Sequence, residues 1–490
     1  MVFDIDKYGS RLAIIADDGR KLTYAELGEL VSERSHSLQR GVLQFCMCKN
    51  TIESIVEYLA CLEAGAPVVM LDATKDAETI ENLRLIYKPG ITKCHPDLAV
   101  CLTTSGSTGS PKLVRLTLRN IIANAESIAE YLQIDENERP ITMLPMYYSY
   151  GLSIINSHLL KGATILLTDK TYAQREFWNF LKENEATSMS GVPYTWELLR
   201  RLRFMRMDLP SVKTMTQAGG KLNAEIALEY IRWAKSVGKQ FIVMYGQTEA
   251  TARMSYLPWE RAEEKYASIG VAIPGGEFYL EENDKENSEE NTKNNLTQKD
   301  ESQVTCSNST SLDPQSAQKQ AFGQPDAQSC SDALTDSSSK NSQKNPKNLQ
   351  GELVYRGPNV SMGYAECAED LMKGDENHGA LHTGDMARVD EDGFYYITGR
   401  QKRFVKVWGN RCNLDQVEQI VKSVTTSCAC AGVDDKITVF TTTDGLEQEI
   451  KTLLSTKTGL NPIAFAVKVI ESIPVTPSGK IDYPLLQEWL

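Results

Sequence analysis

The chain has 490 residues, of which 41% are hydrophobic and 24% charged, and a formal net charge of −13 at pH 7, so it is expected to form at least two globular domains. The negative charge and the absence of a long Lys/Arg cluster argue against a nucleic-acid binder, because phosphate backbones favour basic surfaces. No apolar stretch of the sequence approaches the length of a membrane span, the first residues lack a secretory signal, and the eleven cysteines are scattered as reduced thiols usually are, so we expect a cytoplasmic protein with no membrane span.

Most of the first 280 residues alternate between helical and strand patterns. Residues 52–65 have helical spacing that ends at a glycine, and residues 66–72 read as a buried strand. The same order, helix and then strand, recurs at 154–169 and at 224–246. Repeated helix-to-strand units predict an α/β fold with substantially parallel sheets.

A loop rich in glycine and hydroxyl groups, TTSGSTGSPK, occupies residues 103–112. Such a loop can hold phosphate, because glycines let backbone N–H groups approach an anion while hydroxyls and a lysine add donors and charge. The Walker pattern does not fit, since Ser110 and Pro111 separate Gly109 from Lys112, and no Rossmann G-x-G-x-x-G pattern is present. A plain Gly/Ser linker is disfavoured by the strand-like and helix-like segments on either side.

The composition changes completely over residues 281–350, which are rich in Asn, Ser, Gln, Lys, Asp and Glu and contain one aromatic residue, Phe322. Such a segment cannot bury enough apolar surface to offset the entropy of ordering, which predicts a disordered polar insertion. A partner-binding or regulatory segment is the alternative. The flanking stretches 275–282 and 351–365 are expected to pair as a hairpin.

A last boundary falls near residues 397–409. The roughly 90 residues beyond it contain an amphipathic helix pattern at 413–424 and several short strand patterns, which is enough for a small α/β domain.

Seven segments in this order resemble the motifs of the adenylate-forming superfamily, which includes acyl-CoA synthetases, luciferases and the adenylation domains of peptide synthetases. The resemblance is collinear over nearly the whole chain, with the insertion excepted. The segments are 102–112 (LTTSGSTGSPK), 217–222 (QAGGKL), 245–251 (YGQTEAT), 351–365 (GELVYRGPNVSMGYA), 381–400 (LHTGDMARVDEDGFYYITGR), 402–418 (KRFVKVWGNRCNLDQVE) and 474–483 (PVTPSGKIDY).

The resemblance implies a large N-terminal adenylation domain, residues 1–399, with β-sheets and flanking helices, and a small mobile C-terminal α/β domain, residues 400–490. It also implies ATP-dependent activation of a carboxylic acid to an acyl-adenylate, with release of pyrophosphate, and then transfer to a thiol. The thiol acceptor is coenzyme A or the phosphopantetheine of an acyl carrier protein, and no motif in the sequence separates the two.

The resemblance also assigns the nucleotide site. Thr248 resembles the α-phosphate hydroxyl, Glu249 the Mg²⁺ ligand, Asp385 the carboxylate that accepts both ribose hydroxyls, and Arg400 the cation near ribose and phosphate. A strand-to-helix turn is the alternative for the segment that holds Thr248 and Glu249. The remaining nucleotide-binding residues are Thr104, Ser105, Gly106, Ser107, Thr108, Gly109 and Lys112 for the β- and γ-phosphates, and Gly219, Gly220, Lys221, Tyr245 and Gly246 around the adenine.

Two lysines are assigned to the two steps. Lys480 resembles the catalytic lysine that bridges the substrate carboxylate and the adenylate oxygens. Lys402 lies at the hinge of the family, and rotation there would remove Lys480 and bring the strand around Lys406 into the site for thiolation. The expected catalytic residues are therefore Lys480, Glu249, Thr248 and Lys406.

The acid pocket is expected to include Tyr148, Tyr150 and Gly151, with Val192 and Tyr194 as a second wall, although a plain core role is equally open for the last two. No aspartate lies between residues 144 and 153 to pair an α-ammonium group, and an unpaired buried ammonium would be costly. An ordinary carboxylic acid, such as a fatty acid, is therefore favoured. The alternatives are an amino-acid-activating enzyme that loads a carrier protein, a degenerate scaffold protein, and a phosphoryl-transferring NTPase.

Overall fold

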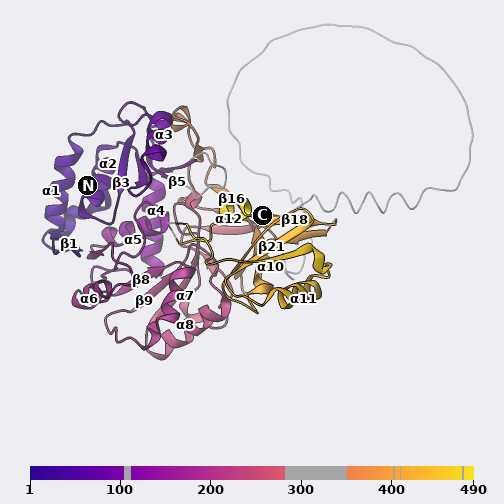
Figure 1. The fold of residues 1–490 in the computed structure, drawn as a ribbon. Coiled ribbons are helices and arrows are strands. Elements are labelled where there is room, and N and C mark those ends of the chain that lie inside the picture. Colours follow the sequence, from indigo (N-terminus) through magenta and orange to yellow (C-terminus); the bar gives the residue numbers. More distant parts are fainter. Residues whose placement is uncertain (104–111, 282–349, 401–402, 409, 477–478) are drawn as a thin grey trace, which may run out of the picture. The chain divides into compact units, whose positions relative to one another are not determined.

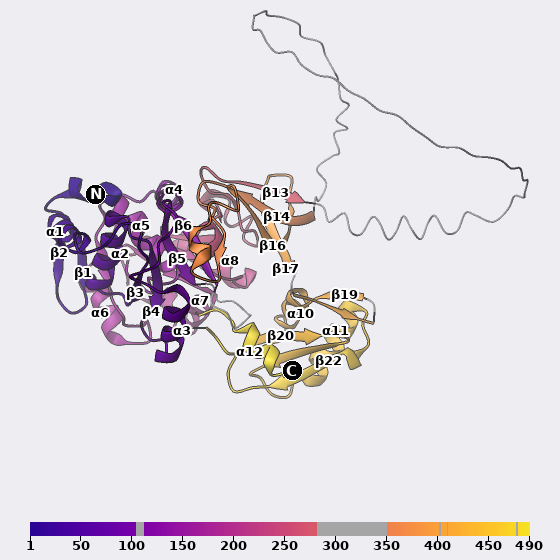
Figure 2. The ribbon, with the colours of Figure 1, turned by 90° about the horizontal axis from the view of Figure 1, so that it is seen from above.

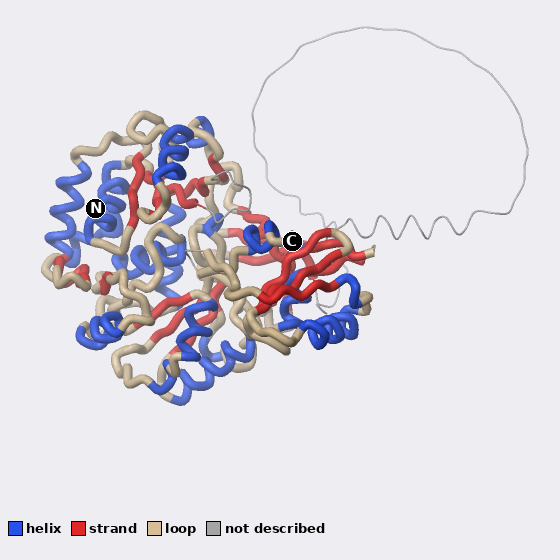
Figure 3. Tube along the Cα trace, viewed as in Figure 1, coloured by secondary structure: helices blue, strands red, loops and turns tan. Residues whose placement is uncertain are grey.

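Within the part of the chain that the structure describes, the strands form six sheets, and helices flank the larger ones (Figures 1 and 3). The mixed α/β architecture expected from the sequence is confirmed. The described residues belong to one compact unit, and none of their helices is long and apolar enough to cross a membrane. This computed structural model describes residues 1–103, 112–281, 350–400, 403–408, 410–476 and 479–490.

The first five-stranded sheet has the strand order β15-β6-β5-β4-β3, in which β3, β4 and β5 are parallel and β6 is antiparallel to β5. The helix predicted to end at Gly65 is α2: the Thr51 side chain accepts from the Ser54 N–H at its start, and Gly65 ends it with φ 64°. The elements of this region are α1 (Tyr24–Ser35), β3 (Gln44–Cys48), α2 (Ile52–Ala64), β4 (Val68–Asp72), α3 (Ala77–Tyr87), β5 (Leu98–Thr103), β6 (Leu113–Thr117), α4 (Leu118–Tyr131) and β15 (Tyr364–Ala365).

The second five-stranded sheet has the order β12-β11-β10-β9-β8, with β8, β9 and β10 parallel and the two short outer strands antiparallel. The predicted helix-and-strand unit at 224–246 is α8 followed by β10, so the parallel arrangement expected from the repeated units is confirmed here too. The elements are α6 (Arg175–Glu183), β8 (Ser188–Gly191), α7 (Pro193–Arg201), β9 (Thr214–Gln217), α8 (Ala224–Ser236), β10 (Gln240–Tyr245), β11 (Ser255–Tyr256) and β12 (Val271–Ala272).

Helix α5 (Ser149–Leu160) packs into two different cores. Its residues Leu152, Ile155 and Leu159 join the core of the first sheet, while Tyr150 and Ile154 join a cluster with residues of β10. Every residue from Ser149 to Leu159 is buried as a result. The helix that carries Tyr150 and Gly151, two residues predicted for the acid pocket, therefore lies against both sheets.

Two further sheets complete the larger part of the fold. The predicted hairpin is confirmed, because β13 pairs antiparallel with β14 although the insertion separates them in sequence. Glu281 and Gln350, the two end residues of the predicted insertion 281–350, belong to these strands, and the rest of that insertion lies outside the described residues. The four-stranded sheet has β13 (Glu277–Glu281), β14 (Gln350–Arg356), β16 (Ala380–Val389) and β17 (Tyr395–Arg400), and the three-stranded sheet has β1 (Leu12–Ala16), β2 (Lys21–Thr23) and β7 (Ile165–Leu167).

The last part of the chain has a core of its own, to which Val417, Val439 and Ile450 contribute. Its strands and helices gather together in Figure 2. The amphipathic pattern at 413–424 forms α10, with Asn413 as the capping residue. The elements are β18 (Phe404–Val407), β19 (Asn410–Asn413), α10 (Leu414–Val421), β20 (Cys428–Val433), β21 (Lys436–Thr441), α11 (Glu447–Thr458), β22 (Phe465–Val469) and α12 (Tyr483–Glu488).

Short segments of 3-10 helix accompany these elements, and one of them carries predicted site residues. They are η1 (Val2–Tyr8), η2 (Phe204–Arg206), η3 (Thr248–Ala250), η4 (Trp259–Arg261), η5 (Glu369–Met372) and η7 (Pro462–Ala464).

Candidate active site

A buried carboxylate lies at the edge of the four-stranded sheet, where Asp385 of β16 pairs in register with Arg400 of β17. Asp385 is 2% exposed. Its Oδ1 accepts from Arg400 Nε at 2.8 Å, and its Oδ2 accepts from the Tyr245 hydroxyl at 2.5 Å and from Gln247 Nε2 at 3.0 Å. The charge of Asp385 raises the pKa of Arg400, and burial, followed by that same charge, raises the pKa of Tyr245 well above its usual value.

Three residues predicted to surround the nucleotide thus meet here: Tyr245, Asp385 and Arg400. Gln247 is a fourth member that the sequence did not single out, although it lies inside the YGQTEAT segment. Its amide also donates to the Thr383 carbonyl at 3.0 Å. Its position between Gly246 and Thr248, two predicted site residues, and its side-chain amide could have pointed to it.

The predicted metal ligand, Glu249, lies in η3 beside Thr248. Its Oε1 accepts from the Tyr364 hydroxyl at 2.7 Å, and no described residue donates to its Oε2. Thr248 Oγ1 lies 3.2 Å from Ser149 Oγ at the start of α5. The described residues contain no group of three or more His, Cys, Asp or Glu side chains that could hold a metal ion alone.

One open carboxylate oxygen fits a magnesium ion that takes its other ligands from phosphate and water, as Mg²⁺ usually does. Tyr364, the partner of Glu249, is itself held by a buried arginine. Arg115, which is 0% exposed, donates through Nε to the Tyr364 carbonyl at 3.1 Å and pairs with Glu376 at 2.5 Å. Both residues were missed because Tyr364 and Glu249 lie 115 residues apart in the chain.

Lys480 reaches the same place from the loop before α12. Its Nζ lies 5.1 Å from the centre of the Tyr148 ring. Burial and the nearby charge of Arg400 lower its pKa to about 8, while the charge of Glu249 acts in the opposite direction. The structure therefore brings Lys480, Arg400, Glu249 and Tyr148 together from four separate segments of the sequence.

The predicted acid-pocket residues fall into two groups. Tyr148, Tyr150 and Val192 belong to a cluster, hereafter the tyrosine cluster, whose other members are Tyr131, Leu132, Leu144, Ile154, Ala218, Ile242, Met244, Tyr256 and Trp259. Gly151 follows Tyr150 in the first turn of α5. Tyr194, by contrast, is 47% exposed on α7.

The glycines predicted around the adenine have close neighbours. A Cβ at Gly219, where φ is +81°, would lie 2.5 Å from the Tyr148 hydroxyl, and a Cβ at Gly246 would collide with the Ala252 carbonyl oxygen. Gly220 lies against Pro193, and Lys221 Nζ donates to the Ile397 carbonyl at 3.1 Å. Burial lowers the pKa of Lys221.

Several residues that were predicted for the active site do not contact Asp385, Glu249 or Lys480 in the described structure. Lys406 lies on β18 with an exposed side chain, and its N–H donates to Asp434 Oδ1 at 2.9 Å. Lys112 Nζ pairs with Glu366 at 2.6 Å, and both side chains are largely exposed, so the pair is weak. Thr104, Ser105, Gly106, Ser107, Thr108, Gly109 and the hinge residue Lys402 lie outside the described residues.

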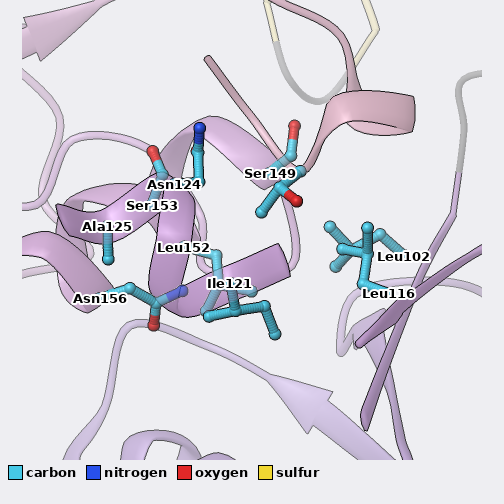
Figure 4. A pocket seen from close by; sticks show the side chains of 10 residues that line it. Leu102, Leu116, Ile121, Asn124, Ala125, Ser149, Leu152, Ser153 and Asn156 are labelled. Atoms are coloured by element: carbon cyan, nitrogen blue, oxygen red, sulfur yellow. The ribbon is translucent and has the colours of Figure 1, made fainter. Parts of the chain in front are cut away.

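A small cavity lies between α4 and α5, and Figure 4 shows residues that line it, among them Ile121, Asn124, Leu152 and Asn156. Its volume of about 10 Å³ is that of one water molecule. It is too small for an acyl group, so it is not the acid pocket.

The family described as AMP-binding enzyme matches residues 4–84 and 88–294, which is more than half of the chain. The chain is 24% identical to the oxalate–CoA ligase of Arabidopsis thaliana over 86% of its length and 72% of that relative. It is 28% identical to the long-chain-fatty-acid–CoA ligase of Escherichia coli O157:H7 over 66% of its length and 48% of that relative. Among solved structures, the o-succinylbenzoate coenzyme A synthetase of Bacillus subtilis in complex with ATP and magnesium ion has a TM-score of 0.71 and 19% identity, covering 99% of this chain and 98% of that one.

Proposed function

Because the chain belongs to the AMP-binding enzyme family, we propose that it activates a carboxylic acid with ATP and passes the acyl group to coenzyme A. The chain is an AMP-forming acid–thiol ligase. One observation carries the proposal for its active site: Lys480 lies against Tyr148, within electrostatic reach of both Arg400 and Glu249. A scaffold protein would have no need to bring these charged groups together.

In the first step, an oxygen of the acid attacks the α-phosphorus of ATP, the bond to the β-phosphate oxygen breaks, and pyrophosphate leaves. Two anions must approach each other, so positive charge has to be in place before they meet. We assign this task to Lys480 and Arg400, and the Thr248 hydroxyl would donate to the α-phosphate. Asp385 and Tyr245 would orient the nucleoside, and the loop at 104–109 would hold the phosphates that leave.

A magnesium ion fits the open oxygen of Glu249. When bound, such an ion offsets charge on the phosphate oxygens. Tyr364 orients the carboxylate through its hydroxyl, and Arg115 fixes the backbone that carries Tyr364. These residues would hold the ion in place rather than take part in bond making.

In the second step, the thiol sulfur attacks the acyl carbonyl carbon and AMP leaves. We propose that Lys406 acts in this step after a rotation at Lys402, since Lys480 and not Lys406 contacts the site in the described structure. Phosphopantetheine on a carrier protein presents the same thiol as coenzyme A and is the second candidate acceptor.

The acid is an ordinary carboxylic acid rather than an α-amino acid. The tyrosine cluster is built from apolar and aromatic side chains, so an α-ammonium group there would be buried without a carboxylate partner. Fatty acids meet this requirement, and we keep them as the candidate class for the proposed site.

The direct test measures pyrophosphate release from ATP with short, medium, long and aromatic acids and with amino acids, in the presence and absence of coenzyme A. We expect release that depends on a non-amino acid without coenzyme A, and an acyl-CoA product when coenzyme A is added. Formation of ADP instead of AMP, or release only with amino acids, would overturn the proposal.

A further inference from the structure

A buried cation with no carboxylate partner among the described residues lies against Tyr150 of the tyrosine cluster. Arg253 is 2% exposed, yet no carboxylate of the described residues lies within ion-pairing distance of its guanidinium. Arg115, which is also buried, differs in this respect because it pairs with Glu376. The guanidinium of an arginine carries a positive charge, so Arg253 places a cation in the interior of the protein.

The backbone fixes the direction of this side chain. The Arg253 N–H donates to Asn124 Oδ1 at 3.3 Å, and its carbonyl accepts from Asn124 Nδ2 at 2.9 Å and from Asn359 Nδ2 at 3.0 Å. Three bonds from two separate segments hold the Arg253 backbone in place. Asn124 and Ser153, which lie near one another in Figure 4, mark this region.

The guanidinium has only partial compensation. Nη1 donates to Ser153 Oγ at 3.0 Å, Nε contacts the Met244 sulfur at 3.4 Å, and the group lies 3.8 Å from the centre of the Tyr150 ring. The Tyr131 hydroxyl also interacts with it. The ring face stabilises a cation, but a hydroxyl and a thioether are weak acceptors for its N–H groups. An anion would satisfy the guanidinium far better, and bidentate pairing with a carboxylate is the geometry that suits it most.

Arg253 and Lys480 each lie over one of two neighbouring tyrosine rings. Lys480 Nζ is 5.1 Å from the Tyr148 ring, the Tyr148 and Tyr150 rings are 6.3 Å apart, and Arg253 is 3.8 Å from the Tyr150 ring. An acid bound against both rings would meet one cation at Tyr148 and the other at Tyr150. Burial raises the pKa of both tyrosines and the charge of Arg253 opposes that rise, as expected if it faces both.

We propose that the acid activated by this enzyme is dicarboxylic, with the reacting carboxylate at Lys480 and the second carboxylate paired with Arg253. The inference rests on the proposed function and narrows it. A plain fatty acid would leave Arg253 unpaired against a hydrocarbon chain, and an α-amino acid would place its ammonium group beside the Lys480 ammonium. A dicarboxylic acid removes both problems.

The first test uses the unmodified enzyme and matched acids. For aliphatic chains from malonate to suberate, and for aromatic diacids, pyrophosphate release is measured with the diacid, its half-amide and the monocarboxylic acid of equal length. We expect at least one diacid to exceed both partners in kcat/KM by about tenfold or more, because a charge-assisted hydrogen bond is worth that much. Monocarboxylic acids that equal or exceed the diacids at every length would overturn the inference and leave the proposed function standing.

The second test compares variants through a ratio, so that a loss of folded protein cancels. Arg253→Met is expected to lower the diacid-to-monoacid ratio of kcat/KM by about tenfold or more, and Arg253→Lys to keep part of it. Arg20→Met removes an exposed guanidinium paired with Glu53 and should leave the ratio unchanged. An unchanged ratio in Arg253→Met contradicts the inference, whereas no pyrophosphate release with any acid contradicts the proposed function itself.

Discussion

Asp385 carries three donors on its two oxygens: Arg400, Tyr245 and Gln247. A carboxylate accepts about four hydrogen bonds. A ribose that donates two hydroxyls to Asp385 therefore has to displace one of the three. Gln247 has the longest of these bonds and a second acceptor in the Thr383 carbonyl, so we expect its amide to move.

The hydroxyl of Tyr364, which donates to Glu249, can be removed to test the proposed metal site. Tyr364→Phe removes the donor to Glu249 and keeps the ring. Groups that orient a metal-ligating carboxylate contribute about 10- to 100-fold to metal affinity, so the Mg²⁺ concentration for half-maximal pyrophosphate release is expected to rise by about tenfold. Tyr266→Phe removes a comparable hydroxyl from the exposed Glu225 and serves as the control. An unchanged Mg²⁺ dependence in Tyr364→Phe would contradict the role assigned to Glu249.

The pKa of Lys480 predicts the pH dependence of the first step. The group is charged below its pKa of about 8 and neutral above it, so the positive charge that the step requires is lost as the pH rises through that value. We expect kcat/KM for pyrophosphate release to fall by about tenfold for each pH unit above 8. Lys480→Arg stays charged, and whatever activity it retains should lack this decline. A decline of equal size in the variant would assign it to another group.

At the scale of elements, the sequence predicted those helices and strands whose pattern is local. Gly65 ends α2 as expected, and the hairpin of β13 and β14 was read correctly across the insertion because each strand has its own alternating pattern. The antiparallel pairing of β5 with β6 was not anticipated. Nothing in the local pattern of a short strand tells which neighbour it pairs with, since register and direction depend on the rest of the sheet.

The site residues also divide into those that a local sequence motif predicts and those that depend on contacts between distant segments. Those inside recognisable segments, such as Asp385 and Lys480, were located from sequence, and the structure places them near Tyr245 and Tyr148 respectively. Tyr364 and Arg253 were missed. Their roles depend on side-chain contacts between segments far apart in the chain, and neither residue type is unusual in its own segment.

The hairpin leads to a prediction about the insertion. Glu281 pairs with Glu352, so the two strands already have the register of a tight turn. Replacing residues 282–349 with Asn-Gly leaves a four-residue loop between these paired residues, because Gln350 and Gly351 remain, and hairpins commonly use loops of this length. The change is expected to leave pyrophosphate release unchanged and to raise the free energy of unfolding, because each halving of loop length contributes about 0.6 kcal/mol. Urea denaturation of both forms measures the difference. A lower unfolding free energy in the shortened chain would show that the insertion packs against the rest of the protein.

As a whole, the molecule has to perform two reaction steps, and the proposed function assigns a different lysine to each. Lys480 contacts the site, while Lys406 has an exposed side chain on β18 in the same described structure. A single fixed arrangement would serve the first step and leave Lys406 without a task. We therefore expect Lys480 to serve adenylation and Lys406 to serve thiolation after the C-terminal residues rotate.

The most direct measurement follows the two half-reactions separately in Lys480→Ala and Lys406→Ala, with acid-dependent pyrophosphate release for the first and transfer from a supplied acyl-adenylate to coenzyme A for the second. Lys480→Ala is expected to lose about 100-fold or more in the first half-reaction, because it removes preorganised charge, and to retain the second within a few-fold. Lys406→Ala should show the opposite pattern. Equal losses in both half-reactions for both variants would contradict the account.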